Sequence, residues 1–139
     1  MARLLLPAGA PGWALNPLLF SALADSMEAA PDARLVREVV FDLPATLGSD
    51  HWWALTRDFV LDEMVARGMA ADVAIHHGAW SGSDTPPHAH VVLTLRSITG
   101  DGFGPVQHAW NGDDIWPAWK APWVGRCAEA QTRKAGASR

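Results

Sequence analysis

His88 and His90 are separated by one residue, inside a segment rich in β-branched residues (88–96). Side chains two positions apart on a β-strand share a face, and their Cα atoms are about 6–7 Å apart. Two imidazoles at this spacing can bind one cation. A single His-x-His pair is common on protein surfaces, so the interpretation depends on whether a third ligand lies nearby.

Alternation along a second segment selects that third ligand between the neighbours His76 and His77. The segment 71–77 predicts a strand in which Val73, Ile75 and His77 share one face and His76 lies on the other. The histidine pair of the following strand also lies opposite an aliphatic face. If both aliphatic faces cover the same core, His76 joins the pair and His77 does not. Three imidazoles would form a facial set with positions open for water or a phosphate oxygen.

Other polar residues are weaker candidates. Glu38, within a strand, and Asp84, in a loop rich in Gly, Ser and Pro, are possible carboxylate partners of the metal ligands; the alternatives are an exposed strand face and a turn residue. His51 begins a helix and is predicted to be structural or solvent-facing. His108 could approach the site from a Gly-rich region. Cys127 stands alone, so nothing supports a nucleophilic role.

Composition limits the class of protein. The 139 residues fit one domain, and 49% hydrophobic with 19% charged residues indicates a globular chain. No apolar run is long enough to span a bilayer. The single cysteine excludes an internal disulfide and favours a reducing cytoplasm. The net charge of −4 argues against strong autonomous DNA binding, which usually needs a basic excess. The chain contains eight Trp and no Tyr.

The remaining segments predict a helix over 16–30, a strand over 35–42 and a helix over 50–67 that ends at Gly68. Beyond Trp110, Pro117 and Pro122 are expected to interrupt any helix, and a frayed polar tail begins near Gln131. This order predicts an α+β or α/β sandwich with helices over one face of a mainly antiparallel sheet.

The segment 85–94, Thr-Pro-Pro-His-Ala-His-Val-Val-Leu-Thr, resembles the metal motif of the MobA/MobL relaxases. The resemblance extends over about residues 4–111. Its further parts are 6–13, 37–38, 43–44, 57–60, 71–76, 99–104 (with Asp-Gly-Phe-Gly) and 110–111. The histidine motif combined with an upstream histidine and the Asp-Gly-Phe-Gly segment is fairly specific.

This resemblance implies a relaxase of the histidine-hydrophobic-histidine superfamily, with an α+β fold in which helices flank an antiparallel sheet. His76, His88 and His90 would hold Mg²⁺ or Mn²⁺, which polarises the scissile phosphate of single-stranded DNA at the origin of transfer. In the family a tyrosine near the N-terminus attacks that phosphate and forms a phosphotyrosyl intermediate. We therefore expect a partial relaxase domain over 1–115, lacking its N-terminal strand, and a divergent, partly disordered tail over 116–139.

The absence of tyrosine is the main departure from the family pattern. It implies a metal-binding domain of plasmid mobilisation that cannot act as an endonuclease alone, with DNA binding weak or lost. Other conjugation proteins are possible partners, and no membrane contact is expected. One alternative is a cupin-like metal protein, since Gly82 precedes His88-x-His90, although Thr94 and Leu95 stand where a cupin has Glu. The other is a non-catalytic vestigial protein, in which His76 and His90 would point to opposite faces.

Overall fold

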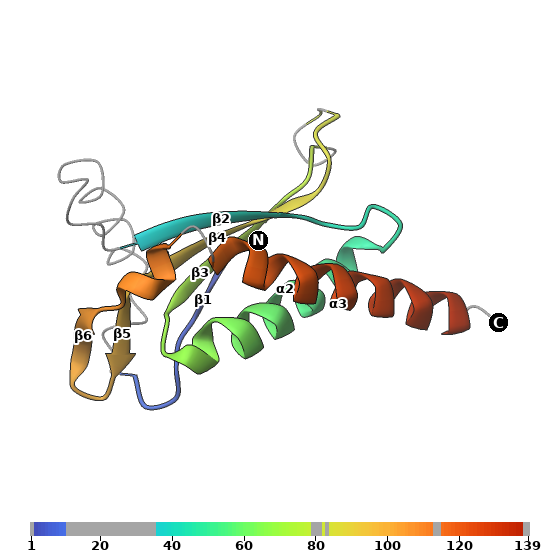
Figure 1. The fold of residues 1–139 in the computed structure, drawn as a ribbon. Helices are drawn as coiled ribbons and strands as arrows, with labels where there is room; N and C mark the ends of the chain where they lie inside the picture. Colours follow the sequence, from blue (N-terminus) through green and yellow to red (C-terminus); the bar gives the residue numbers. More distant parts are fainter. Residues whose placement is uncertain (1, 11–35, 79–81, 83, 113–114, 138–139) are drawn as a thin grey trace.

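The computed structural model describes residues 2–10, 36–78, 82, 84–112 and 115–137 (Figure 1). The helix predicted over 16–30 lies outside these residues. Four strands form one sheet in which every neighbouring pair is antiparallel. In the order in which they lie side by side, they are β1 (Ala2–Leu5), β3 (Ala71–His76), β4 (His88–Thr94) and β2 (Val36–Asp42).

Two helices, α2 (Ser49–Glu63) and α3 (Ile115–Ala137), lie on the same face of this sheet (Figure 1). The predicted α+β class, with helices over one face of an antiparallel sheet, is confirmed. The smaller elements are η3 (Val65–Arg67), η5 (His108–Asn111) and a two-stranded sheet of β5 (Arg96–Thr99) and β6 (Gly102–Val106). None of the helices in the described part of the chain has both the length and the apolar character that a membrane span requires.

The core forms where the aliphatic face of the sheet meets the two helices. Val91 and Leu93 of β4 are buried, as alternation predicts, and their strand neighbours face the other side. Phe41 of β2 contacts Phe59 of α2 and Trp123 of α3, with ring centroids 5.2 Å apart in both pairs. This aromatic cluster joins the sheet to both helices, so it fixes α2 and α3 on one face of the sheet.

Helix α2 is shorter than the predicted helix over 50–67, although the helical segment formed by α2 and η3 together ends at Gly68, as the sequence indicated. Helix α2 stops at Glu63, and the chain continues as η3 up to Gly68. Gly68 has φ 104°, the left-handed conformation that a residue with a Cβ atom rarely adopts. The predicted strand over 88–96 also divides, because β4 ends at Thr94 and β5 begins at Arg96.

Helix α3 differs most from the prediction. The sequence indicated an interrupted helix and a frayed tail, whereas the structure has one helix from Ile115 to Ala137. Pro117 lies in the first turn, where backbone N–H groups have no helical acceptor, so its missing N–H costs little. Pro122 removes one internal hydrogen bond, and burial of the neighbouring Trp119 and Trp123 offsets that loss. A domain boundary near residue 115 stays a prediction.

Candidate metal centre

The register of the central strands brings the three predicted ligands together. His76 of β3 lies directly opposite His88 of β4, and His90 lies opposite Ala74. Cross-strand partners share a face of the sheet, as do residues two apart on one strand. His76, His88 and His90 therefore occupy one corner of the sheet face that lies away from α2 and α3.

The imidazole rings are close in space as well as in register. The ring centroids are 5.4 Å apart for His76 and His88, 4.7 Å for His76 and His90, and 4.9 Å for His88 and His90. Imidazoles that share one ion, with metal–nitrogen bonds of about 2.1 Å, have centroids roughly 4.5–5.5 Å apart. The centroid spacing is therefore in the range expected for three imidazoles around one cation.

Two of the rings are held through their Nδ1 atoms. The Nδ1 of His88 is 2.9 Å from the backbone oxygen of Pro86, and the Nδ1 of His90 is 2.7 Å from Oε1 of Glu38. In a neutral imidazole, an Nδ1–H that donates to an oxygen leaves Nε2 unprotonated, with its lone pair available for a cation. Glu38 reaches His90 from the edge strand β2, so three of the four strands contribute to the cluster.

The rings need one further adjustment before they could bind an ion. In the part of the chain that the structure describes, no group of three His, Cys, Asp or Glu side chains is arranged to hold a metal ion. His76 and His88 are nearly parallel, with an interplanar angle of 9°. Because His76 is exposed, its ring has room to turn, whereas His88 and His90 are anchored through Nδ1. The metal role of these residues stays a prediction.

The crowding of the rings changes the titration of His76. Its pKa is lowered from 6.5, first by partial loss of water contact and then by repulsion from the protonated forms of His90 and His88. His76 is therefore neutral at physiological pH and keeps a lone pair for coordination. A lowered pKa also means that protonating His76 opposes folding, so its contribution to stability is lost as the pH falls below 6.5.

The other candidate residues lie elsewhere. His77 contacts the ring of Trp52 on α2, with centroids 5.1 Å apart, so it faces the helices as alternation predicted. Asp84 is exposed in the loop after β3, and no contact found among the described residues joins it to a histidine. His51 is an exposed residue of α2, on the helix side of the sheet, and lies 3.6 Å from Asp50.

Cys127 is half-buried on α3, and burial raises the pKa of its thiol to about 11. The thiol is therefore protonated at neutral pH, which makes it a poor nucleophile. The sequence likewise offers no support for a nucleophilic role of Cys127.

Two aspartates on the histidine face were not among the predicted candidates. Asp42 is the cross-strand partner of His88 on β2, and Asp72 lies on β3 four residues before His76. Burial raises the pKa of Asp72. Strand alternation places both on the face of His76, so their side was available from the sequence. The pairing of β2 with β4, which sets Asp42 beside His88, was not.

Comparison with known proteins identifies the family. The model of the MobA/MobL family matches residues 1–135, and the chain belongs to this family. A conjugal transfer protein TraA of Agrobacterium fabrum is 36% identical over 122 residues, which cover 79% of this chain and 10% of the relative. A probable conjugal transfer protein TraA of Sinorhizobium fredii is 34% identical, covering 78% and 10% respectively. The chain thus spans about a tenth of the length of these relatives.

A solved structure has the same fold. It is described as the molecular basis of vancomycin resistance transfer in Staphylococcus aureus and superposes with a TM-score of 0.78. The match covers 96% of this chain and 70% of the other, with 20% sequence identity. At this identity the likeness establishes the architecture alone.

Proposed function

We propose that this chain acts in conjugal DNA transfer, using His76, His88 and His90 to bind Mg²⁺ or Mn²⁺ against a phosphate of single-stranded DNA. The observation that carries the proposal is the cluster of three rings with centroids 4.7–5.4 Å apart on one sheet face. Membership of the MobA/MobL family supports the biological context, since the relatives are named as conjugal transfer proteins.

Some residues of the chain would bind the metal ion, and others would orient the rings that bind it. The three imidazoles would present Nε2 atoms, while Glu38 and the Pro86 carbonyl fix the rings of His90 and His88 through Nδ1. A divalent cation bound there would supply Lewis acidity to a phosphate oxygen. Loss of the Glu38 carboxylate would let the His90 ring turn, so Glu38 is a positioning residue rather than a ligand.

Relaxases use a tyrosine as the nucleophile, and the sequence of this chain contains no tyrosine. The proposed role is therefore to bind and orient origin-of-transfer DNA. Cleavage by the chain alone is not expected. The net charge of −4 predicts that the chain alone binds DNA weakly, since a chain without a basic excess gains little affinity from the DNA backbone. Other conjugation proteins are the natural partners for such a domain.

Two observations argue against the alternatives, a vestigial protein and a cupin-like protein: the geometry of the histidines and the family match. A vestigial protein with incidental histidines would place His76 and His90 on opposite faces, but their rings lie 4.7 Å apart. A cupin-like protein is disfavoured by the MobA/MobL match over residues 1–135.

The test is binding of a fluorescently labelled single-stranded oligonucleotide by anisotropy, with and without Mn²⁺. We expect Mn²⁺ to strengthen binding at least about tenfold, because the ion would add a direct phosphate contact. His88→Ala/His90→Ala should remove this gain, whereas Lys120→Ala, an exposed residue of α3 on the helix side of the sheet, should keep it. Equal affinity with and without Mn²⁺, or a covalent DNA adduct formed by the chain alone, would contradict the proposal.

A further inference from the structure

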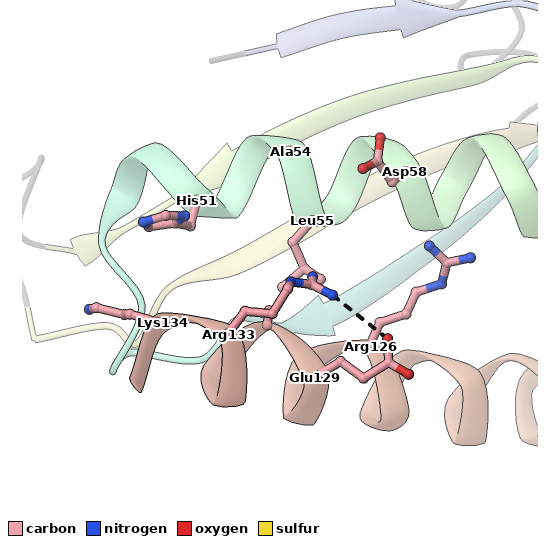
Figure 2. Close-up of a pocket in the computed structure, with 9 residues that line it drawn as sticks. His51, Ala54, Leu55, Asp58, Arg126, Glu129, Arg133 and Lys134 are labelled. Carbon is pink, nitrogen blue, oxygen red and sulfur yellow. Dashed lines mark ion pairs between the residues drawn. The ribbon is translucent and has the colours of Figure 1, made fainter. Parts of the chain in front are cut away.

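A groove between α2 and α3 lies on the other side of the sheet from the histidines (Figure 2). Its volume is about 480 Å³. Small and aliphatic residues, Ala54 and Leu55 of α2 and Ala130 of α3, form the apolar part of its lining. Because the two alanines are short, the facing helices leave space between them that larger side chains would fill.

One end of this groove is cationic. Arg133 and Lys134 of α3 and His51 at the start of α2 line it, and Figure 2 shows His51 and Lys134 at the same end of the groove. The Lys134 ammonium donates to the backbone oxygen of Thr46 at 2.6 Å, which positions the group while leaving its charge in place. Two cations of α3 and the imidazole of His51 on α2 therefore line the same space, with Asp50 lying 3.6 Å from that imidazole.

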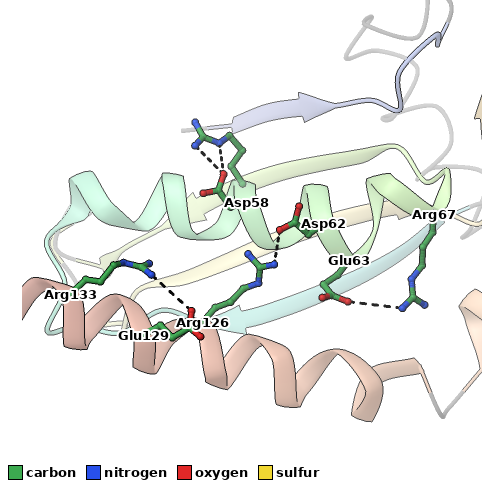
Figure 3. A network of polar contacts seen from close by, with 8 residues as sticks. Asp58, Asp62, Glu63, Arg67, Arg126, Glu129 and Arg133 are labelled. Carbon is green, nitrogen blue, oxygen red and sulfur yellow. Dashed lines mark hydrogen bonds and ion pairs between the residues drawn. The ribbon is translucent and has the colours of Figure 1, made fainter.

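The acidic residues near the groove are largely matched by other cations. Asp58 lies 3.0 Å from Arg57, and Arg126 lies 2.6 Å from Asp62 (Figure 3). These two carboxylates therefore add little net negative charge to the groove.

Glu129, the other acidic residue of the lining, is only loosely paired. It lies 3.9 Å from Arg133, and the two side chains are 73% and 72% exposed. A pair this exposed contributes little to stability, so an incoming anion can compete for the guanidinium.

We propose that the α2–α3 groove is an anion site that takes a phosphate group, either free or carried by the backbone of a nucleic-acid strand. Arg133 and Lys134 would donate charge-assisted hydrogen bonds, and a ring N–H of His51 would donate a further one. This site is separate from the histidine cluster and does not depend on the function proposed for it.

The lining also indicates how a nucleic acid would be held there. Apart from His51, the residues that line the groove include no aromatic ring on which a base could stack. Contact would therefore be to phosphate, without regard to base sequence, and would be sensitive to salt. With a net charge of −4 over the chain, such affinity must come from this local cluster rather than from the whole surface.

The first arm of the test uses inorganic phosphate alone. Amide chemical shifts of the full chain are followed by NMR during titration with sodium phosphate at constant ionic strength, without divalent metal. We expect shifts around residues 51 and 130–134, and at least about a fivefold loss of affinity in Arg133→Ala/Lys134→Ala. The matched control is Arg67→Ala/Lys120→Ala, which removes the same charge from the helices outside the groove.

The second arm uses a labelled dT oligonucleotide and measures the salt dependence of its binding. If the strand's phosphates enter the groove, Arg133→Ala/Lys134→Ala should lower the slope of log affinity against log salt by roughly 1.4, about 0.7 for each phosphate that is no longer neutralised. A response to phosphate without this change supports a site for free phosphate.

Three results would overturn the proposal. They are no phosphate-induced shifts in the groove, equal losses in the groove and control variants, or binding of a poly-glutamate peptide there with none of phosphate. His88→Ala/His90→Ala should leave the phosphate response intact, so failure at the histidine cluster can be told apart from failure here.

Discussion

His76 and His77 are adjacent in the chain, yet they face opposite sides of β3 and have different surroundings. The ring centroid of His76 lies 4.7 Å from that of His90, whereas the ring centroid of His77 lies 5.1 Å from that of Trp52 on α2. Strand alternation alone separates them, so this part of the candidate site was predictable from the sequence. The distinction gives a paired test at the level of single residues.

We expect His77→Ala to lower the free energy of unfolding by about 1 kcal/mol, because the variant lacks the edge-on packing of two aromatic rings. His76→Ala should change stability less and abolish Mn²⁺ binding. Tryptophan fluorescence during urea unfolding and a Mn²⁺ titration of both variants measure the two effects. If His77→Ala lost the metal and His76→Ala kept it, the assignment of faces would be reversed.

The partners that hold the rings were only partly predictable. Glu38 was a candidate because a carboxylate on a strand can orient a ligand, and it lies 2.7 Å from the Nδ1 of His90. The contact of Pro86 was not predictable from the sequence, because the Pro86 carbonyl reaches Nδ1 of His88 only through the conformation of the loop before β4. Backbone contacts of this kind depend on tertiary structure and leave no pattern of residue types.

At the level of elements, β2, β3, β4 and α2 followed from periodicity, whereas β5 and α3 did not. Two prolines and a polar C-terminal stretch predicted interruption, yet α3 runs from Ile115 to Ala137. Trp119 and Trp123 are 0% and 6% exposed, and their burial against the sheet outweighs the local cost of Pro122. The sequence shows that proline destabilises a helix locally. It does not show how much free energy the burial of Trp119 and Trp123 against the sheet contributes in return.

We expect Pro122→Ala to stabilise the protein by about 1–3 kcal/mol, because it restores a helical hydrogen bond and removes a ring clash. Pro117→Ala is the control, since the first turn has no acceptor for the N–H that it adds, and its effect should be within about 0.5 kcal/mol. Far-UV circular dichroism during urea unfolding measures both variants. Equal effects of the two substitutions would contradict the explanation given for α3.

At the level of the whole molecule, the sheet divides two surfaces of different chemistry. Both helices cover one face, and the groove between them carries the proposed phosphate site (Figures 1 and 2). The histidines lie on the other face. The sequence predicted the fold class and the histidine face, since each strand carries its own alternation. The groove depends on how α2 packs against α3, and no local pattern contains that information.

The central claim is that the three histidines form a metal site, and calorimetric titration of the intact chain with Mn²⁺ tests it most directly. We expect about one Mn²⁺ per chain at neutral pH, where the lowered pKa keeps His76 unprotonated. Binding should be lost in His88→Ala/His90→Ala and retained in His51→Ala. Absence of binding to the intact chain, or binding that survives loss of His88 and His90, would contradict the account.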